Sequence, residues 1–484
     1  MQVHFLWYAW ERGGATSQAD MQAMAQEWHL FHAVPIKPAG DAYRKPSGQF
    51  GIDDLWDDKI EDSIHWLHNN FSYDLVVANY VFMSRALQHL QNSGAALVLD
   101  THDLMSGRDD LLAGHGLERQ FFYTSRSEEA RAYDRSDLVL AIKPEDQSIM
   151  QRMTDRPVLV VGHDLPEAFE VWAPEAVPFR AGMIGSNNGI NRACFASMIE
   201  ALSQHRHRLP EAFRLLIAGQ VGAALPQPLP DFVELMGVQA SLPQFYGAVD
   251  LCLVPVAFGT GLKIKTVEAL SYGCPVAGLS HAFEGLEATE PSHTAAGYED
   301  LAIIVADLLS DATALQRLAE TSRAVFRRYR RTVSGQYEAL LAACADVASA
   351  KVSTLSELAS PDDMPEDMPI IVYGAGAGCG YFLSILSTQQ QSRVVAILDA
   401  YKAGDQAFGY PLFRPDALPV GQRSQALVVL TITTPEIVVV RDRLTALGYR
   451  TIRSGRRLIL NGLFGPRDRP ARPTEARDAM KDSL

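Results

Sequence analysis

A glycine loop followed by two lysines and a glutamate stands in the middle of the chain. The stretch PVAFGTGLKIKTVEALSYGCPVAG (residues 255–278) follows the apolar run DLCLV and passes through Gly259 and Gly261 into a sequence with helical spacing. Backbone N–H groups and the helix dipole at such a start favour an anion, for example a diphosphate. Lys263 and Lys265 fall in the first helical turn, where the dipole disfavours cations unless an anionic ligand compensates them.

Glu268 follows one helical turn after these lysines. A carboxylate at that place can accept two hydrogen bonds from a ribose diol, as acidic residues do in nucleotide-binding folds. An exposed helix start with ordinary surface charges would show the same spacing. From spacing alone, the stretch therefore fits either a nucleotide site or a plain surface helix.

Short aliphatic runs alternate with helical stretches along the whole chain, which predicts α/β domains with parallel sheets. A first series of strand candidates lies near residue 3 and at 73–80, 95–103, 137–143 and 157–164. A second series lies at 179–186, 213–219, 233–238, 250–256 and 274–280. A third lies at 369–380, 393–400 and 426–432. A long amphipathic stretch, from about 311 to 350, closes the second series.

These series predict three Rossmann-like domains. We expect the first at 1–170, the second at 171–347 and an accessory one at 369–465. Residues 348–368, rich in Ser, Asp and Pro, read as a linker, and the Arg, Asp and Pro-rich tail 466–484 as a disordered end.

Composition narrows the class of protein. The 484 residues are 47% apolar and 21% charged, with no apolar run long enough for a membrane span. The start of the chain lacks the features of a signal peptide, which predicts a soluble cytoplasmic protein. A net charge of −14 argues against nucleic-acid binding. The five cysteines have no metal or disulfide spacing, so we expect reduced, buried thiols and no bound metal.

The run GTGLKIKTVEALSYGCPVAG, followed by HAFEGL, resembles the donor-binding segment of glycosyltransferase family 4. LMGVQASLPQFYGAVDLCLVP, MIGSNNGINR, LLIAGQ, WERGGATSQ, LVLDTHDL and ARAYDRSDLVLAI are similar to further segments of that family, so the resemblance covers about residues 1–345. It implies a GT-B fold, with the acceptor on the first domain and a nucleotide-sugar donor on the second. It also implies transfer with retention of configuration and without a metal.

The same resemblance implies roles for individual residues. His102, Lys263 and Glu268 would form the catalytic set, with His102 facing the sugar and Glu268 the donor ribose. The expected donor-binding residues are Gly13, Gly14, Ser186, Asn187, Val238, Gly259, Gly261 and Lys265. One position departs from the family. Many members have two glutamates eight residues apart, and Glu268 corresponds to the second of them. At the position of the first, this chain has Thr260. The identity of the donor sugar therefore does not carry over.

The third domain opens with its own glycine loop, GAGAGCG, between a strand and a helix. Gly374, Gly376 and Gly378, with Asp399 ending the next strand, fit a nucleotide-binding loop. The domain resembles the sugar-nucleotide-binding Rossmann domain of bacterial sugar acetyltransferases. It lacks a Tyr-x-x-x-Lys pair or another acid-base set, so we expect a binding or assembly module instead of a second enzyme.

Three further groups of residues have plainer interpretations. The acidic run Asp53, Asp54, Asp57 and Asp58 reads as the solvated face of a helix. The basic cluster Arg323, Arg327, Arg328, Arg330 and Arg331 reads as an exposed helical face, with an anionic lipid or polyanionic acceptor as the alternative. His205 and His207 lie at a helix end, where cationic side chains are ordinary.

Together these observations predict a cytoplasmic glycosyltransferase, either free or peripheral at the inner face of the membrane. It would transfer a sugar from a UDP- or GDP-sugar to a glycan, glycolipid or protein acceptor, with no other cofactor. A homo-oligomer is compatible with these observations. One alternative is another GT-B enzyme such as an epimerase, which would need catalytic carboxylates in the first domain. The other is a non-catalytic sugar-nucleotide-binding protein.

Overall fold

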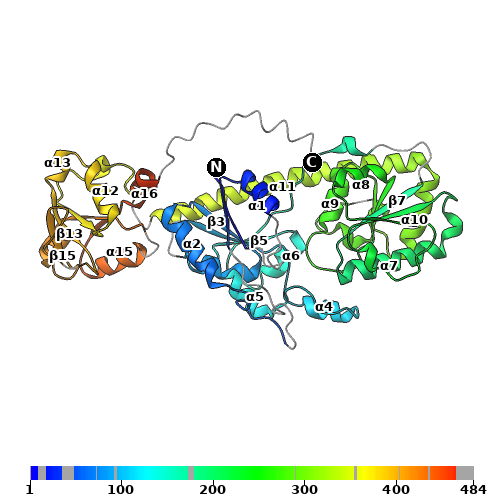
Figure 1. The fold of residues 1–484 in the computed structure, drawn as a ribbon, viewed down its shortest axis with the longest axis horizontal. Helices are drawn as coiled ribbons and strands as arrows, with labels where there is room; N and C mark the ends of the chain where they lie inside the picture. Colours follow the sequence, from blue (N-terminus) through cyan, green and yellow to red (C-terminus); the bar gives the residue numbers. More distant parts are fainter. Residues whose placement is uncertain are drawn as a thin grey trace.

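The computed structural model describes residues 2–8, 18–34, 48–71, 73–91, 95–172, 179–288, 290–353, 357–402, 404–433 and 437–464. Gly13, Gly14 and the tail 466–484 lie outside the described residues. The described chain forms three α/β units in a row, with the second unit at one end and the third at the other (Figure 1). The prediction of an α/β fold with parallel sheets is confirmed.

The first unit has a four-stranded parallel sheet of order β3-β4-β5-β6 and a separate parallel pair, β1 with β2. Its strands are β1 (His4–Trp7), β2 (Leu30–Ala33), β3 (Leu75–Asn79), β4 (Ala96–Asp100), β5 (Leu138–Ala141) and β6 (Val158–Val160). Its helices are α1 (Gln18–Glu27), α2 (Asp58–Asn70), α3 (Arg85–Gln88), α4 (Arg108–Gly114), α5 (Arg126–Tyr133) and α6 (Pro144–Met150).

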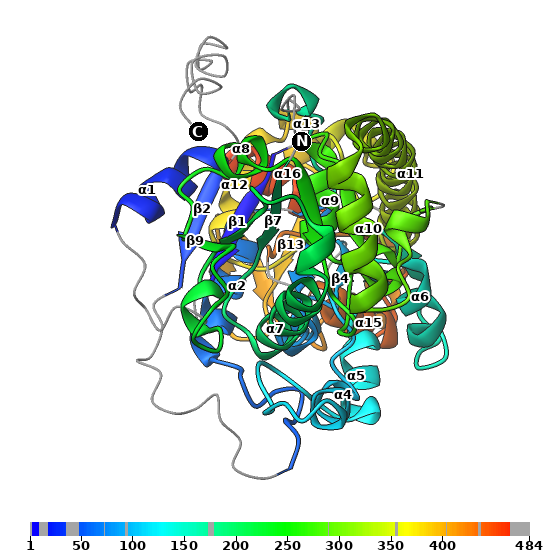
Figure 2. The ribbon, with the colours of Figure 1, turned by 90° about the vertical axis from the view of Figure 1, so that its right-hand side faces the viewer.

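The second unit is a five-stranded parallel sheet of order β11-β10-β7-β8-β9. Its strands are β7 (Arg180–Ile184), β8 (Arg214–Ala218), β9 (Val233–Gly237), β10 (Leu251–Val254) and β11 (Val276–Gly278). Its helices are α7 (Gly189–Gln204), α8 (Leu242–Ala248), α9 (Ile264–Ser271) and α10 (Tyr298–Ser310). Figure 2, which looks onto this unit, shows helices on both faces of the sheet.

Successive residues of β8 explain why the strands of the second unit are continuous apolar runs. Leu215 and Ile217 pack into the core with α7 and α10. Leu216 and Ala218 point the other way, into the core with α8 and α9. A parallel strand that is buried on both faces has no polar alternation. This is the physical reason that the runs were readable from the sequence.

Helix α11 (Ala312–Ser353) belongs to two units. Its first half contributes Phe326 and Val333 to the core of the second unit. Its second half places Leu340 and Cys344 against Val98 and other residues on one face of the first unit's sheet. Figure 1 shows the helix running along both units. The stretch expected to close the second unit therefore also covers the first.

The third unit is a six-stranded sheet of order β14-β15-β13-β12-β16-β17, parallel except for the β14–β15 pair. Its strands are β12 (Ile370–Tyr373), β13 (Val394–Leu398), β14 (Gln406–Ala407), β15 (Tyr410–Phe413), β16 (Leu427–Leu430) and β17 (Thr451–Ser454). Its helices are α12 (Ala377–Ile385), α13 (Thr388–Gln391), α14 (Val420–Gln425), α15 (Ile437–Ala446) and α16 (Arg456–Phe464).

The segment before β12 is packed onto the third unit. Leu358 and Met364 are buried in its core, and Glu357 forms a β-bridge with Ser454. At the junction with the first unit, Nη2 of the buried Arg456 lies 2.7 Å from Nε2 of His68. Residues 357–368 of the expected linker are therefore bound to the unit that follows, whereas residues 348–353 are the end of helix α11 (Ala312–Ser353) and pack on the first unit.

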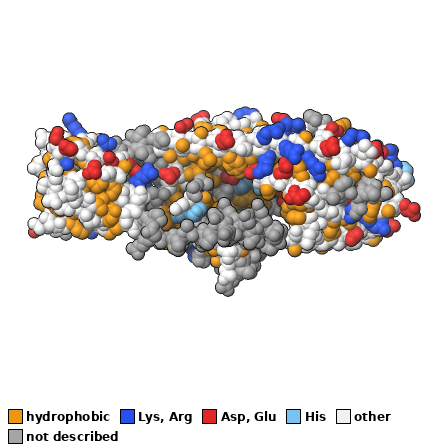
Figure 3. Space-filling view, turned by 90° about the horizontal axis from the view of Figure 1, so that it is seen from above, with side chains coloured by type: hydrophobic (Ala, Val, Ile, Leu, Met, Phe, Trp, Pro, Cys, Tyr) orange, Lys and Arg blue, Asp and Glu red, His pale blue; other side chains and the backbone are white. Residues whose placement is uncertain are grey.

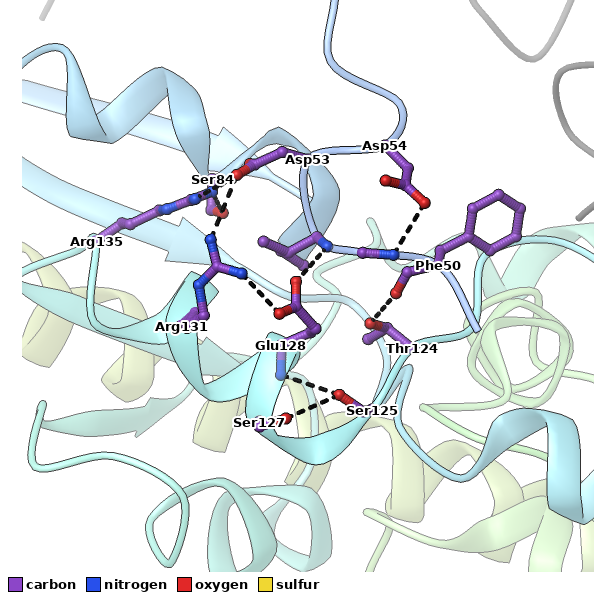
Figure 4. A network of polar contacts seen from close by, with 12 residues as sticks. Phe50, Asp53, Asp54, Ser84, Thr124, Ser125, Ser127, Glu128, Arg131 and Arg135 are labelled. Carbon is purple, nitrogen blue, oxygen red and sulfur yellow. Dashed lines mark hydrogen bonds and ion pairs between the residues drawn. The ribbon is translucent and has the colours of Figure 1, made fainter. Parts of the chain in front are cut away.

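The acidic run near residue 53 is a turn and a helix cap, which corrects the expectation of a single solvated helix face. Arg135 donates to both carboxylate oxygens of Asp53, at 2.6 and 2.7 Å (Figure 4). Asp57 caps α2 by accepting from the backbone N–H of Lys59. In the same network, Glu128 accepts from the backbone N–H of Ile52 at 2.8 Å. These acids fasten the 48–57 segment to the first unit.

Lys and Arg side chains lie beside Asp and Glu side chains on the face of the molecule seen in Figure 3. The ion pairs are Arg327 with Glu167, Arg328 with Glu287 and Arg330 with Asp164, at 3.1, 3.3 and 3.6 Å. The guanidinium of Arg323 instead lies over the rings of Phe169 and Trp172. The cluster is thus built into contacts along the helix.

All five cysteines are free and buried, as predicted. Among the described residues, no helix combines the length and the apolar character needed to cross a membrane.

Candidate donor-binding site

A cavity of about 630 Å³ lies where strands of the second unit end. Gly185 after β7, Gly219 after β8 and Val256 after β10 line it. The carboxyl ends of parallel strands are the usual ligand site of open α/β sheets. Asp103 and Arg108 of the first unit complete the wall. The predicted glycine loop and α9 lie in this cavity.

The loop before α9 takes a backbone shape that requires its glycines. Gly259 and Gly261 have φ angles of +136° and +67°. A Cβ on Gly261 would lie 2.0 Å from Oδ1 of Asp103, so this glycine also allows the first unit to approach. The two glycines therefore shape both the loop and the contact between units.

Two lysines, the buried Lys263 and the half-buried Lys265, stand at the start of α9, and no hydrogen bond joins either of them to a carboxylate of the described residues. Lys263 donates to the carbonyl oxygens of Gly261 and Thr260, at 2.8 and 3.1 Å. Lys265 donates to Oδ1 of Asn191 at 2.6 Å. Burial lowers the pKa of each lysine to about 8. A bound anion would restore the full charge of both, because it offsets the cost of burying a cation.

Glu268 is on the same helix and lines the cavity. The hydroxyl of Tyr246 donates a hydrogen bond of 3.4 Å to its Oε2. Burial raises the pKa of Glu268, while the Tyr246 bond and nearby Lys265 act in the opposite direction. The carboxylate is thus oriented by α8 and sits in a partly desolvated place.

The other predicted donor-binding residues divide into two groups. Ser186 lines the cavity, as does Val238, which is 72% exposed. Asn187 is not among the lining residues and instead accepts a hydrogen bond of 2.8 Å from Arg192.

His102 lies at the edge of the cavity, on the first unit. Its φ angle is +58°, which a non-glycine residue adopts at a cost of ~1–3 kcal/mol. Its carbonyl oxygen would lie 3.1 Å from a Cβ on Gly261, so its backbone faces the glycine loop. Its Nε2 is 3.7 Å from Oδ2 of Asp100, and its ring is 4.6 Å from that of Tyr80. The structure therefore brings His102 and the loop together across the two units.

Sequence reasoning missed the contacts that join the two units at this cavity. Arg108 donates to Oγ1 of Thr260 at 2.7 Å. The rings of His115 and Phe258 stack with their centroids 3.6 Å apart. Asp103 and Arg108 stand next to His102 in the chain, which is the only sequence signal that could have pointed to them.

A charged cluster holds the units together beside Lys263. Lys143 of the first unit contacts the carboxylate of Glu284 of the second, and its Nζ lies 3.7 Å from Oδ1 of Asp146. Glu284 also pairs with Nδ1 of His281 at 2.8 Å. Burial raises the pKa of Asp146 to about 6. The cluster ties the two units beside the donor cavity.

The glycine loop of the third unit has a firm internal structure. Gly374 has a φ of +99°, and a Cβ on Gly378 would lie 2.3 Å from the carbonyl oxygen of Thr431. A Cβ on Gly376 would meet nothing within 4 Å. Asp399 accepts hydrogen bonds from the backbone N–H groups of residues 375, 401 and 402. In the described structure this carboxylate therefore holds the loop.

Residues 178–319 match the family model described as glycosyl transferases group 1. The chain is a glycosyltransferase. The match runs from β7 into α11 and contains the glycine loop, both lysines and Glu268. The prediction of a glycosyltransferase is confirmed by this match.

Solved glycosyltransferase structures resemble this glycosyltransferase at low identity. HepE of Anabaena in complex with UDP and glucose is 15% identical, with a TM-score of 0.47, and the alignment covers 66% of this chain and 88% of that one. A glycosyltransferase from Rickettsia africae is 12% identical, with a TM-score of 0.46 and coverage of 71% and 97%. The pneumococcal O-GlcNAc transferase GtfA in complex with UDP and GlcNAc is 13% identical, with a TM-score of 0.41 and coverage of 60% of both chains. No curated protein sequence matches the chain.

Proposed function

We propose that this glycosyltransferase binds a UDP- or GDP-sugar in the cavity of the second unit. It transfers the sugar, with retention of configuration and without a metal ion, to a glycan, glycolipid or protein acceptor on the first unit. The observation that carries the proposal is the pair of lysines at the start of α9, one buried and one half-buried, next to two glycines with positive φ. Such a pair of cations beside a glycine loop suits a diphosphate.

Each residue has a distinct task in the proposed reaction. When the bond between sugar and diphosphate breaks, negative charge grows on the leaving phosphate. Lys263, Lys265 and the amides at the start of α9 stabilise that charge, and one well-placed donor contributes ~3 kcal/mol to such a transition state. These groups belong to a buried loop, so little reorganisation is needed as the charge appears.

Glu268 accepts hydrogen bonds from the hydroxyls of the donor ribose, while Ser186 and Val238 lie toward the nucleotide. His102 faces the sugar from the first unit, where the acceptor approaches. The backbone contact between His102 and the Gly261 loop supports this arrangement, because it puts residue 102 of the first unit next to the diphosphate end of the cavity. We also propose that the branch of the family is glycosyltransferase family 4.

A direct test measures thermal shifts of the full chain with UDP, GDP and CMP, because a ligand that binds the folded state raises its melting temperature. We expect one nucleoside diphosphate to stabilise the chain, and Glu268→Ala to lose most of that shift. Nucleotide release from the matching nucleotide sugar, measured with and without EDTA, then tests turnover and metal independence. The absence of any nucleotide-induced shift would contradict the proposed site.

A further inference from the structure

The first unit meets the donor cavity with one guanidinium and one carboxylate. Of the described residues that line the cavity, only Asp103 and Arg108 come from that unit. In the proposed reaction the acceptor lies on the first unit, so the transferred sugar must lie between the diphosphate and this wall. The inference below rests on that proposed function. The charged and hydrogen-bonding groups of this wall therefore indicate which kind of sugar the cavity binds.

Contacts hold the Arg108 side chain in one orientation and leave one of its buried donor atoms for a ligand. Its Nη1 donates to Oγ1 of Thr260 at 2.7 Å and lies 3.5 Å from Oδ2 of Asp103. The ring of Phe121 lies 5.7 Å from the guanidinium carbon. The Nε atom of Arg108 is buried and has no hydrogen-bond partner among the described residues. A buried donor of this kind costs free energy unless a ligand completes it.

The carboxylate of Asp103 offsets only part of the positive charge in the cavity lining. It is shared between two cations, Arg108 and Lys263, and receives a hydrogen bond from Thr260. Burial is the largest influence on Asp103 and raises its pKa, which weakens its hold on a negative charge. The only other acidic residue in the lining is Glu268, on α9. The lining therefore holds three cations, Arg108, Lys263 and Lys265, against the two carboxylates of Asp103 and Glu268.

We propose that Arg108 selects a donor whose sugar is acidic, and that its guanidinium binds the carboxylate of a uronic acid. A planar guanidinium matches a carboxylate better than it matches a neutral hydroxymethyl group. Thr260 supports this role, because its hydroxyl accepts a hydrogen bond from Arg108 and holds the guanidinium at the cavity wall. The diphosphate has other partners: the lysines follow Thr260 in the loop, and Lys263 folds back onto loop carbonyls. Arg108 is thus a specificity-determining residue.

The experiment compares pairs of donors that differ only at C6 of the sugar. Isothermal titration of the full chain would use UDP-glucuronate against UDP-glucose, or GDP-mannuronate against GDP-mannose if GDP is the nucleotide that binds. We expect the uronate to bind at least about ten-fold more tightly, as a charged hydrogen-bonded pair would provide. Arg108→Gln should abolish this preference while leaving the affinity for the free nucleoside diphosphate unchanged. Arg126→Gln, which alters an exposed arginine of α5 in the same unit, should keep the preference.

The outcomes separate the two proposals. If neither UDP nor GDP binds, the proposed function fails and this inference fails with it. If a nucleotide binds but the uronate shows no advantage, only the inference is overturned. An equal loss of uronate and free nucleotide in Arg108→Gln would place Arg108 on the diphosphate and also overturn it. If Arg108→Gln does not fold, the wild-type comparison of uronate with neutral sugar still decides.

Discussion

The hydroxyl oxygen of Tyr246 lies 3.4 Å from Oε2 of Glu268, which links α8 to α9 inside the second unit. Tyr246 is fully buried, so the position of this carboxylate depends on the core. The functional group is therefore held by two helices of one rigid unit, and a substitution at Glu268 tests the site without opening the cleft.

Glu268→Gln should weaken binding of the nucleoside diphosphate by about ten-fold or more, because an amide replaces a charged acceptor of the ribose hydroxyls. Titration calorimetry measures the loss, and Glu234→Gln, an exposed glutamate on β9, is the matched control. Burial raises the pKa of Glu268, so wild-type affinity should fall on acidification at a higher pH than an ordinary glutamate would give. Unchanged affinity in the variant would remove Glu268 from the site.

The two lysines predict a loss of affinity in alkaline solution. Their pKa values of about 8 mean that both are charged below this pH and become neutral above it. The stabilisation by diphosphate should therefore shrink between pH 7 and pH 9, with each lysine contributing up to about ten-fold per pH unit. Thermal shifts with saturating nucleotide across this range measure it.

The lysines also determine whether the stability of the unliganded protein rises or falls with pH. Because their pKa values are lower in the folded chain than in the unfolded chain, the unfolded state holds more protons between about pH 8 and 10.5. Their contribution to folding therefore becomes more favourable as pH rises through this window. Lys263→Met should reduce the pH dependence of diphosphate binding and the pH dependence of folding stability. A variant with the wild-type pH profile would contradict the proposed role of Lys263.

His102→Asn should lower turnover by about ten-fold or more while nucleotide affinity changes little, since we propose that the imidazole faces the transferred sugar. Asparagine is the suitable replacement because it tolerates the positive φ of residue 102 better than alanine does. Steady-state kinetics measures the turnover, and calorimetry measures the nucleotide affinity. His207→Asn, at an exposed histidine, should leave both unchanged. A parallel loss of nucleotide affinity would place His102 on the nucleotide.

Adjacent leucines of α11 offer a matched test of its contact with the first unit. Leu340 is 7% exposed and Leu341 is 52% exposed. Leu340→Ala should lower the free energy of unfolding by ~2–5 kcal/mol, whereas Leu341→Ala should change it by less than ~0.5 kcal/mol. Urea titration monitored by fluorescence measures both. Equal effects would mean that α11 does not cover the first sheet in solution.

The third unit can be probed through two of its loop glycines. Gly378→Ala should destabilise this unit, because the new methyl group would lie 2.3 Å from a backbone carbonyl. Gly376→Ala should be nearly neutral, since nothing lies within 4 Å of its new methyl group. Limited proteolysis, with nucleotide binding measured in parallel, tests whether the damage stays in the third unit. Loss of donor binding in Gly378→Ala would show that the units are coupled.

The strands that sequence patterns identify most directly are those buried on both faces. β10 is apolar throughout, and β7 and β8 are apolar after their first residue, an arginine. β2 contains His32 and is only half-buried, and β14 has two residues. Neither leaves a run of apolar residues long enough to recognise. Local patterning therefore predicts the sheets and misses their edges.

The same distinction applies to the donor site. Gly259, Gly261, Lys263, Lys265 and Glu268 lie within ten residues, so one continuous stretch predicted their juxtaposition. Arg108 meets Thr260 across 152 residues, and Lys143 meets Glu284 across 141. Contacts of this kind depend on how two units pack, and no local spacing in a single sequence encodes that packing. The tertiary fold was required to find them.

Helix α11 also sets an order of events during synthesis. The strands of the first unit are complete by Val160, yet Leu340 and Cys344 cover one face of their sheet. A nascent chain that has emerged only as far as the second sheet still exposes apolar side chains of β4 and β5 to water. Such exposed faces are where chaperones bind and where aggregation begins. The first unit of this chain is therefore expected to finish folding after the second one has formed.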